Sequence, residues 1–190
     1  MARNAKSFPK QAKKVFQGQI FDVYQWEQEL FDGSTAIYES LARPDSVQTV
    51  GALDDGKILM IEDEQPNREA IITAAGGKAD VAGESPEEAA KREFLEETGY
   101  EVGELVPWYS YAEHSKINWF VYVFIGRKLR KVQEPELEAG ERIKLLPYEF
   151  DDFLQLGRNE KLRDRMTRIC LLEALVDKKK RDELERLLYG

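Results

Sequence analysis

Alternating hydrophobic and polar positions dominate the first two-thirds of the chain and predict a protein rich in strands. The stretch from Val15 to about Ala42 alternates on both sides of the turn FDGS and predicts a β-hairpin. A second strand-turn-strand unit is expected in SVQTVGAL, DDGK and ILMIEDE, where Asp55-Gly56 supplies the turn. Further strands are predicted at EAIITAA, VGELVPWYSYAE, INWFVYVFIGRKL and ERIKLLPY.

A helix interrupts this pattern in the middle of the chain. Ser85 can cap its start, Pro86 suits the first helical position, and Glu88 completes a capping box. Gly99 can adopt the left-handed conformation that ends a helix. The sequence therefore predicts a helix from Pro86 to Thr98, preceded by a glycine-rich loop.

The C-terminal part of the chain is helical in composition. Residues 160–188 contain neither Gly nor Pro, and Leu or Ile recurs at roughly helical spacing, while YEFDDFLQL predicts a short helix before them. The basic run KKKR is followed at once by DELERLL, so we interpret it as a solvated helix face rather than a nucleic-acid signal.

Composition limits the number of domains. The 190 residues are 42% hydrophobic, which fits one domain of roughly 100 to 150 residues with extensions. We expect a flexible N-terminus at 1–14, a hairpin extension at 15–45, the main domain at 46–157 and a helical tail at 158–190.

Charge and cysteine content narrow the class of protein. The formal net charge of -8 argues against nucleic acid as a partner, and Cys170, the single cysteine, excludes an internal disulfide framework. The chain has no secretory signal and no run of about 18 apolar residues, so we expect a cytoplasmic protein without a membrane partner.

Three glutamates fall on one face of the predicted central helix. At about 100° per residue, Glu93, Glu96 and Glu97 share an arc of about 100°. One interpretation is an ordinary acidic face in water. Like charges four residues apart repel on an isolated helix, however, whereas a divalent cation would convert this repulsion into ligation. Mg²⁺ takes oxygen ligands and commonly bridges carboxylates and phosphates.

The same region carries a spaced pattern that resembles the Nudix box. The matching positions are Glu84, seven residues, then Arg92, Glu93, Phe94, Glu96, Glu97, Gly99 and Tyr100. One position departs from the pattern, because six residues instead of five separate Gly77 from Glu84. The family's glycine is therefore either Gly76 or Gly77.

The resemblance implies an α/β (α+β) Nudix fold, with a mixed β-sheet sandwiched between helices. It also implies metal-dependent hydrolysis of a nucleoside diphosphate linked to another group. By resemblance, Glu93 and Glu97 are the principal metal ligands and Glu96 is an additional ligand. The carbonyl of Gly76 or Gly77 completes the coordination. The implied metal is Mg²⁺, with Mn²⁺ as an alternative.

The resemblance gives the remaining motif residues supporting roles. Arg92 would brace the glutamates, Glu84 would tie the loop to the helix, and Gly99 would close the helix.

Attack of water on a diphosphate requires charge neutralisation and an oriented, deprotonated water, which metal ions and a free carboxylate can supply. His114, the only histidine, is interpreted as a loop residue, with substrate contact as the alternative.

Outside the box, the chain resembles the ADP-ribose pyrophosphatase branch of the family. The similar segments are the N-terminal hairpin, ILMIEDEQP and the late acidic loop EPELEAGERIKLLP. This branch implies a homodimer built through the hairpin, and a glutamate of the late loop that assists the catalytic water. Glu141 is the first candidate and Glu138 the second, unless the loop is acidic only because it is exposed.

The substrate is the least determined feature. Arg43 and Arg68 are candidates for phosphate binding, with ordinary surface or paired arginines as the alternative. The leading hypothesis is hydrolysis of ADP-ribose or a similar nucleoside diphosphate sugar to AMP (or another NMP) and a sugar phosphate. Alternatives are NADH or another dinucleotide, a GDP-sugar, a non-catalytic nucleotide-binding Nudix module, and an acidic protein without a ligand. Aromatic candidates for stacking the base are Phe16, Tyr24, Trp26, Trp108 and Tyr109.

Overall fold

The computed structural model describes residues 8–190, except for the side chains of Glu113 and His114. The first half of the expected flexible N-terminus and any substrate contact of His114 therefore lie outside the described residues. From residue 8 onward, the chain enters its first strand at Lys13.

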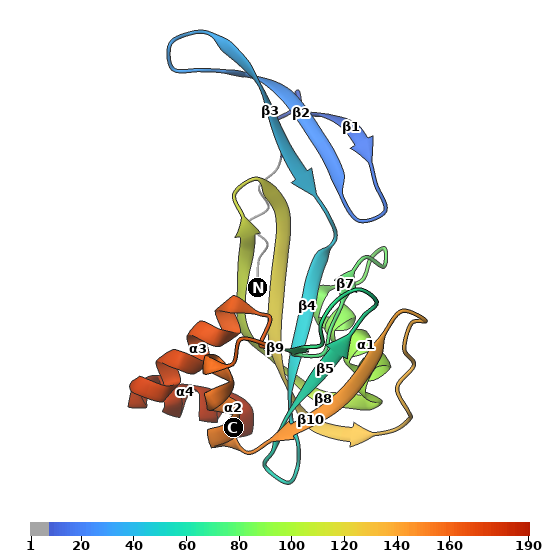
Figure 1. The fold of residues 1–190 in the computed structure, drawn as a ribbon, viewed down its shortest axis with the longest axis vertical. Coiled ribbons are helices and arrows are strands. Elements are labelled where there is room, and N and C mark those ends of the chain that lie inside the picture. Colours follow the sequence, from blue (N-terminus) through green and yellow to red (C-terminus); the bar gives the residue numbers. More distant parts are fainter. Residues whose placement is uncertain (1–7) are drawn as a thin grey trace.

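One mixed sheet of ten strands organises the molecule (Figure 1). Its main path is β1-β2-β3-β9-β4-β5-β10, with β6 beside β5, β7 beside β4 and β8 beside β9. The β3–β9 and β4–β9 pairs are parallel, and the other named pairs are antiparallel. The strands are β1 (Lys13–Gln17), β2 (Asp22–Glu29), β3 (Thr35–Ala42), β4 (Asp45–Ala52), β5 (Ile58–Glu64), β6 (Ile71–Thr73), β7 (Lys78–Ala79), β8 (Tyr100–His114), β9 (Ile117–Lys131) and β10 (Arg142–Tyr148).

Helices cover both faces of this sheet. Helix α1 (Pro86–Thr98) lies on one face, and α2 (Phe150–Gln155), α3 (Arg165–Val176) and α4 (Lys178–Tyr189) lie on the other (Figure 1). A short 3₁₀ helix, η1 (Leu156–Arg158), joins α2 to the segment before α3. The predicted mixed sheet between helices is confirmed.

The hairpin extension is one strand larger than expected. Strands β2 and β3 form the predicted hairpin, and β1 pairs with β2 on the outer side. The alternating stretch expected from Val15 is interrupted between Gln17 and Asp22, because the N–H of Gly18 donates to the carbonyl of Phe21 and closes a turn. The three strands project from the body of the molecule (Figure 1).

The caps of α1 are those that the sequence predicts. The Ser85 hydroxyl accepts from the Glu88 N–H at 3.2 Å, and a Glu88 carboxylate oxygen accepts from the Ser85 N–H at 2.8 Å. Gly99 ends the helix at a φ of 73°, and a Cβ at this position would lie 2.1 Å from the carbonyl oxygen of Gln133. The helix boundaries are therefore set by local sequence.

The C-terminal tail is not one helix. Residues 159–164 lie outside any helix, Asp164 caps α3, and Asp177 caps α4 by accepting from the N–H groups of Lys179 and Lys180. These two aspartates interrupt a composition that otherwise favours helix throughout, because their side chains satisfy backbone donors at new helix starts. No helix in the described part of the chain is long and apolar enough to cross a membrane.

Candidate active site

Helix α1 is fixed to the sheet by its apolar side, which determines where its glutamates point. Phe94 is fully buried and packs in one core cluster with Leu59 of β5. On the neighbouring positions, the side chain of Glu93 is 16% exposed and that of Glu96 is 41% exposed. Glu97 is partly buried. Glu93 and Glu97 therefore face the interior of the site, and Glu96 lies nearer to solvent.

Arg92 binds the glutamates together. Its Nε and Nη2 donate to the two carboxylate oxygens of Glu84 at 3.0 and 3.1 Å. Its Nη1 donates to Glu93 at 2.7 Å and to Glu96 at 3.1 Å, and Nη2 also donates to the Lys78 carbonyl at 3.2 Å. These hydrogen bonds, first that of Glu84, raise the pKa of Arg92. The guanidinium thus links the helix to the loop before it.

The two glycines of the loop leave no room for side chains. The Gly76 N–H donates to a carboxylate oxygen of Glu97 at 2.6 Å, and a Cβ on Gly76 would lie 2.0 Å from the Val47 carbonyl oxygen. A Cβ on Gly77 would lie 2.2 Å from a carboxylate oxygen of Glu93. The Gly77 carbonyl accepts from the Val47 N–H at 3.0 Å. Both glycines therefore touch the glutamate face, in different ways.

The longer loop before Glu84 is accommodated by a turn. The Glu84 N–H donates to the Val81 carbonyl at 3.2 Å, and Gly83 takes a φ of 86°. This turn returns the chain to Arg92, so the extra residue does not separate Glu84 from its partner.

Glu97 lies in the most unfavourable environment for a negative charge. Burial, followed by the charges of Glu141, Glu93 and Asp63, raises its pKa to about 9, although the hydrogen bond from Gly76 opposes the shift. Burial also raises the pKa of Glu93 and of Glu141. The negatively charged forms of these carboxylates are all disfavoured, and a bound cation would stabilise them. The set is therefore suited to binding a cation.

A cleft of about 380 Å³ opens beside Glu97; we call it the main cleft. It collects expected site residues from five separate segments of the chain. Those that line it are Arg43, Arg68, Gly76, Gly77, Glu97 and Glu141.

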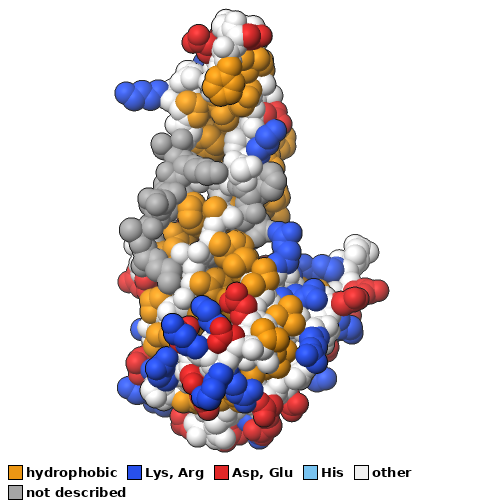
Figure 2. All heavy atoms as spheres, turned by 90° about the vertical axis from the view of Figure 1, so that its left-hand side faces the viewer, with side chains coloured by type: hydrophobic (Ala, Val, Ile, Leu, Met, Phe, Trp, Pro, Cys, Tyr) orange, Lys and Arg blue, Asp and Glu red, His pale blue; other side chains and the backbone are white. Residues whose placement is uncertain are grey.

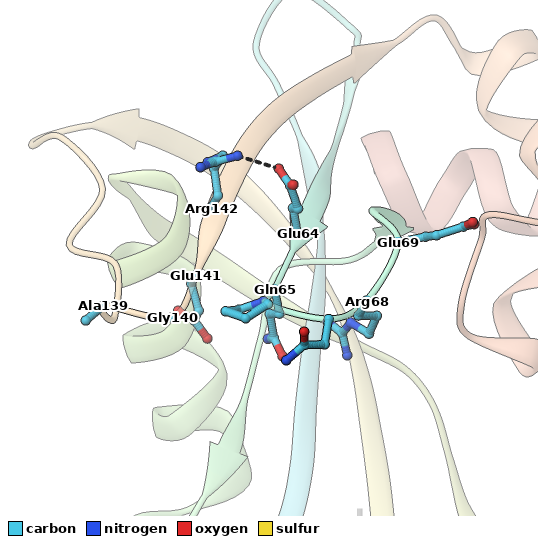
Figure 3. A pocket seen from close by; sticks show the side chains of 10 residues that line it. Glu64, Gln65, Arg68, Glu69, Ala139, Gly140, Glu141 and Arg142 are labelled. Carbon is cyan, nitrogen blue, oxygen red and sulfur yellow. Dashed lines mark hydrogen bonds and ion pairs between the residues drawn. The ribbon is translucent and has the colours of Figure 1, made fainter.

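A second hollow of about 560 Å³ adjoins the main cleft between the β5–β6 turn and the loop before β10 (Figure 3). Gln65, Arg68 and Glu141 line both hollows. At its edge, Arg142 donates to Glu64 at 2.9 Å. Figure 3 shows Glu141 on one side and Gln65 and Arg68 on the other, so the late acidic loop forms a wall of the site.

The two candidate phosphate-binding arginines are held differently. Arg68 forms an ion pair with Asp63 at 2.6 Å. The guanidinium carbon of Arg43 lies 4.3 Å from the centre of the Trp119 ring, a cation–π contact. Burial, and then the positive charge of Arg163, lowers the pKa of Arg43. Both guanidinium groups are therefore oriented before any substrate enters.

Comparison with known proteins agrees with this geometry. The profile of the NUDIX domain matches residues 43–169. The chain belongs to the Nudix family. It is 29% identical over 158 residues to an ADP-ribose pyrophosphatase of Bacillus subtilis (strain 168), covering 82% of this chain and 85% of that protein.

Two further relatives extend the comparison of this Nudix hydrolase. A methanol dehydrogenase activator of Bacillus methanolicus is 26% identical over 162 residues, covering 84% of this chain and 87% of the relative. The crystal structure of an ADP compounds hydrolase superposes with a TM-score of 0.72 at 20% identity, covering 90% of this chain and 92% of that one. This structural likeness shows that the fold is shared.

The Nudix carboxylates fit a metal that keeps most of its own water. Within the described residues, no three acidic, histidine or cysteine side chains are grouped closely enough to hold an ion together. Glu93 is paired with Arg92, and Glu97 accepts from Gly76, so each carboxylate already has a partner in the protein. Mg²⁺ commonly uses one or two carboxylates besides water and substrate phosphates, so Glu93 and Glu97 suffice as its protein carboxylates.

Several expected residues lie away from the main cleft. Glu138 lines neither hollow; its carbonyl accepts from the Glu141 N–H at 3.0 Å. None of the five aromatic candidates for base stacking is among the described residues that line the main cleft. Trp108 packs against the core instead, and Tyr109 hydrogen-bonds to Asp164.

The tertiary structure adds cleft residues that sequence reasoning missed. Asp63 is 8% exposed, and one of its carboxylate oxygens has no hydrogen-bond partner among the described residues. Trp119 and Tyr111 line the cleft from β9 and β8, and Arg163 reaches it from the C-terminal part of the chain. These residues have no fixed spacing to the Nudix box, so no sequence signal identified them.

Proposed function

We propose that this Nudix hydrolase cleaves the diphosphate of ADP-ribose or a similar nucleoside diphosphate sugar, giving AMP or another NMP and a sugar phosphate. The observation that supports this most directly is the main cleft, which combines Glu97 and Glu141 with Arg43 and Arg68. Carboxylates suit the metal, and guanidinium groups suit phosphate oxygens. The similarity to the ADP-ribose pyrophosphatase of Bacillus subtilis supports the same substrate class.

The metal in this proposal is Mg²⁺, or Mn²⁺. Glu93 and Glu97 would hold it, Glu96 would assist from the solvent side, and the Gly76 carbonyl is the better backbone candidate. The Gly77 carbonyl already accepts from the Val47 N–H. When bound, the ion supplies positive charge to the phosphate oxygens and lowers the pKa of a coordinated water.

The protein's own groups complete the catalytic set. Arg92 keeps Glu93 oriented, and Arg68, paired with Asp63, faces the same cleft as Glu97. We assign Glu141 to orient the attacking water and accept its proton, because it lines the cleft and burial raises its pKa above that of an ordinary glutamate.

We assign recognition of the base to the part of the main cleft that Trp119 lines. Trp119 already carries the Arg43 guanidinium against its ring, and Ile20 lines the same cleft. A flat base can stack on the indole, whereas the diphosphate extends past the Arg43 guanidinium toward Glu97.

We also infer a homodimer formed through the projecting strands β1–β3. Large apolar side chains are exposed there: Phe16 is 60% exposed, Ile37 62% and Phe31 115%. Figure 2 shows apolar side chains gathered along this projection and again over the body below it. A three-stranded unit with this much exposed apolar surface is suited to covering by a partner.

The decisive experiment is a substrate panel with wild-type protein and Glu97→Gln. With Mg²⁺ present, we expect wild-type protein to release phosphate-monoester products from ADP-ribose, and kcat to fall at least about a hundredfold in Glu97→Gln. Glu101→Gln is the matched control, because its side chain is 54% exposed and lies just after α1. No product from any of ADP-ribose, NADH and GDP-sugars would contradict the proposal and favour a nucleotide-binding module.

A further inference from the structure

The C-terminal part of the chain forms part of the main cleft. Arg163, Asp164 and Arg165 line it, although they follow the Nudix box by more than 60 positions. We call residues 159–190 the C-terminal unit. Its first segment and the first residue of α3 face the site.

One anchor of this segment is the strand that leads into the glycine loop. The Arg163 N–H donates to the Ile72 carbonyl at 2.9 Å, and the Ile72 N–H donates to the Lys161 carbonyl at 2.8 Å. Leu162, between them, is only 2% exposed. Because Ile72 lies on β6, four residues before Gly76, the backbone of Arg163 is fixed relative to the glutamate site.

The other anchor is the side chain of Asp164. It is 7% exposed and accepts hydrogen bonds from the Tyr109 hydroxyl at 3.1 Å, the Tyr111 hydroxyl at 2.5 Å and the Thr167 N–H at 2.5 Å. Strand β8 and helix α3 thus hold the peptide on the other side of Arg163. The Arg163 backbone is restrained at both ends, while its side chain is exposed.

The charges at this point of the cleft are unbalanced. The positive charge of Arg163 is close enough to Arg43 to disfavour its protonated form. Arg43 donates to the Pro44 carbonyl and the Ser46 hydroxyl, both neutral. Among the described residues, no carboxylate forms an ion pair with either guanidinium. Two like charges held together in a cleft favour a shared anionic ligand.

We infer that Arg163 is a substrate-binding residue, which with Arg43 holds the phosphate oxygens of a nucleoside diphosphate. This inference rests on the proposed function, since it assigns a further binding residue to the same cleft. It gives the C-terminal unit a role: α3 and the tyrosines of β8 position a guanidinium that the Nudix box does not supply. Arginine suits this position because its planar fork matches two phosphate oxygens.

The test is the binding of ADP to the full chain, measured by calorimetry in the presence of EDTA so that neither metal nor turnover contributes. We expect Arg163→Gln to weaken ADP binding between about tenfold and a hundredfold, as for the loss of a hydrogen bond to a charged group. Arg158→Gln is the matched control: it removes the same charge from an exposed position of η1 outside the cleft, and we expect unchanged affinity.

Each outcome separates this inference from the proposed function. If Arg163→Gln binds ADP as tightly as wild-type protein, the inference is wrong even where diphosphate hydrolysis is found. If no diphosphate is hydrolysed but Arg163→Gln still weakens ADP binding, the binding role stands and the hydrolytic function fails. Should Arg163→Gln not fold, Arg163→Lys keeps the charge but loses the fork, and we expect an intermediate affinity; wild-type affinity in Arg163→Lys would count against bidentate binding.

Discussion

The electrostatic environment of the site acts most strongly on the pKa of Glu97. Burial and three neighbouring carboxylates raise its pKa from 4.5 to about 9. Near neutral pH, the metal-free protein therefore holds a proton on Glu97. A metal ion must displace this proton, so metal affinity and pH are coupled.

This coupling predicts how stability depends on pH. The raised pKa of Glu97 favours the folded state below pH 4.5, and this contribution is lost as the pH rises towards about 9. In EDTA, we expect the thermal midpoint of wild-type protein to fall between pH 6 and pH 9, and to fall less in Glu97→Gln. Mg²⁺ should raise the wild-type midpoint more at pH 9 than at pH 6. Scanning fluorimetry measures all four conditions, and an identical pH dependence in both proteins would disprove the assignment.

At the scale of elements, the start of α3 connects three parts of the fold. Asp164 caps α3 and accepts from two tyrosines of β8, and the neighbouring residues bond to β6. Tyr109 is itself largely buried, which raises the pKa of its hydroxyl. The cap therefore does more than begin a helix, since it fixes the C-terminal unit against the sheet.

We expect Asp164→Ala to be far more damaging than Asp177→Ala. Loss of a cap costs about 1 kcal/mol, and loss of each hydrogen bond from a tyrosine hydroxyl to Asp164 adds about 1 kcal/mol. Asp164→Ala should therefore lower the free energy of unfolding by roughly 3 kcal/mol, against about 1 kcal/mol for Asp177→Ala, whose side chain only caps α4. Urea denaturation measures both. Equal losses would show that the tyrosine contacts contribute nothing.

At the scale of the whole molecule, the proposed homodimer depends on the projecting strands. The exposed apolar residues of β1 and β3 lie far from the helices that cover the rest of the sheet (Figures 1 and 2). A second copy of the chain would cover these residues. If the two copies were related by a twofold axis, the same residues of both copies would be buried.

Sedimentation tests this arrangement. We expect wild-type protein to sediment at twice its chain mass of 21.9 kDa at micromolar concentration, and Ile37→Asp to shift it toward monomer. A charge at this 62% exposed position would be buried without a partner in the dimer. Val132→Asp introduces the same charge at a 45% exposed position outside the projection and should leave the dimer intact. A single 21.9 kDa species for wild-type protein would refute the homodimer.

The sequence by itself determined the features whose signals are local. The span of α1, its capping box and the left-handed Gly99 depend on residues within one turn of each helix end. The shared face of Glu93 and Glu97 follows from helical periodicity. For the same reason, the Nudix box could be identified despite its longer loop, and the resemblance to that family implied the layered fold.

Only the tertiary structure decided which distant residues share the site. The β-bridge beside Arg163, the long strand pair that contains Trp119 and the partly buried ion pair of Asp63 bring these residues to one cleft. Such contacts join residues many positions apart, where no periodicity relates them. The break in the C-terminal tail has the same origin, because Asp164 is held by tyrosines of β8 that composition alone does not connect to it. Local hydrogen bonding set the elements, and packing between them selected the cleft.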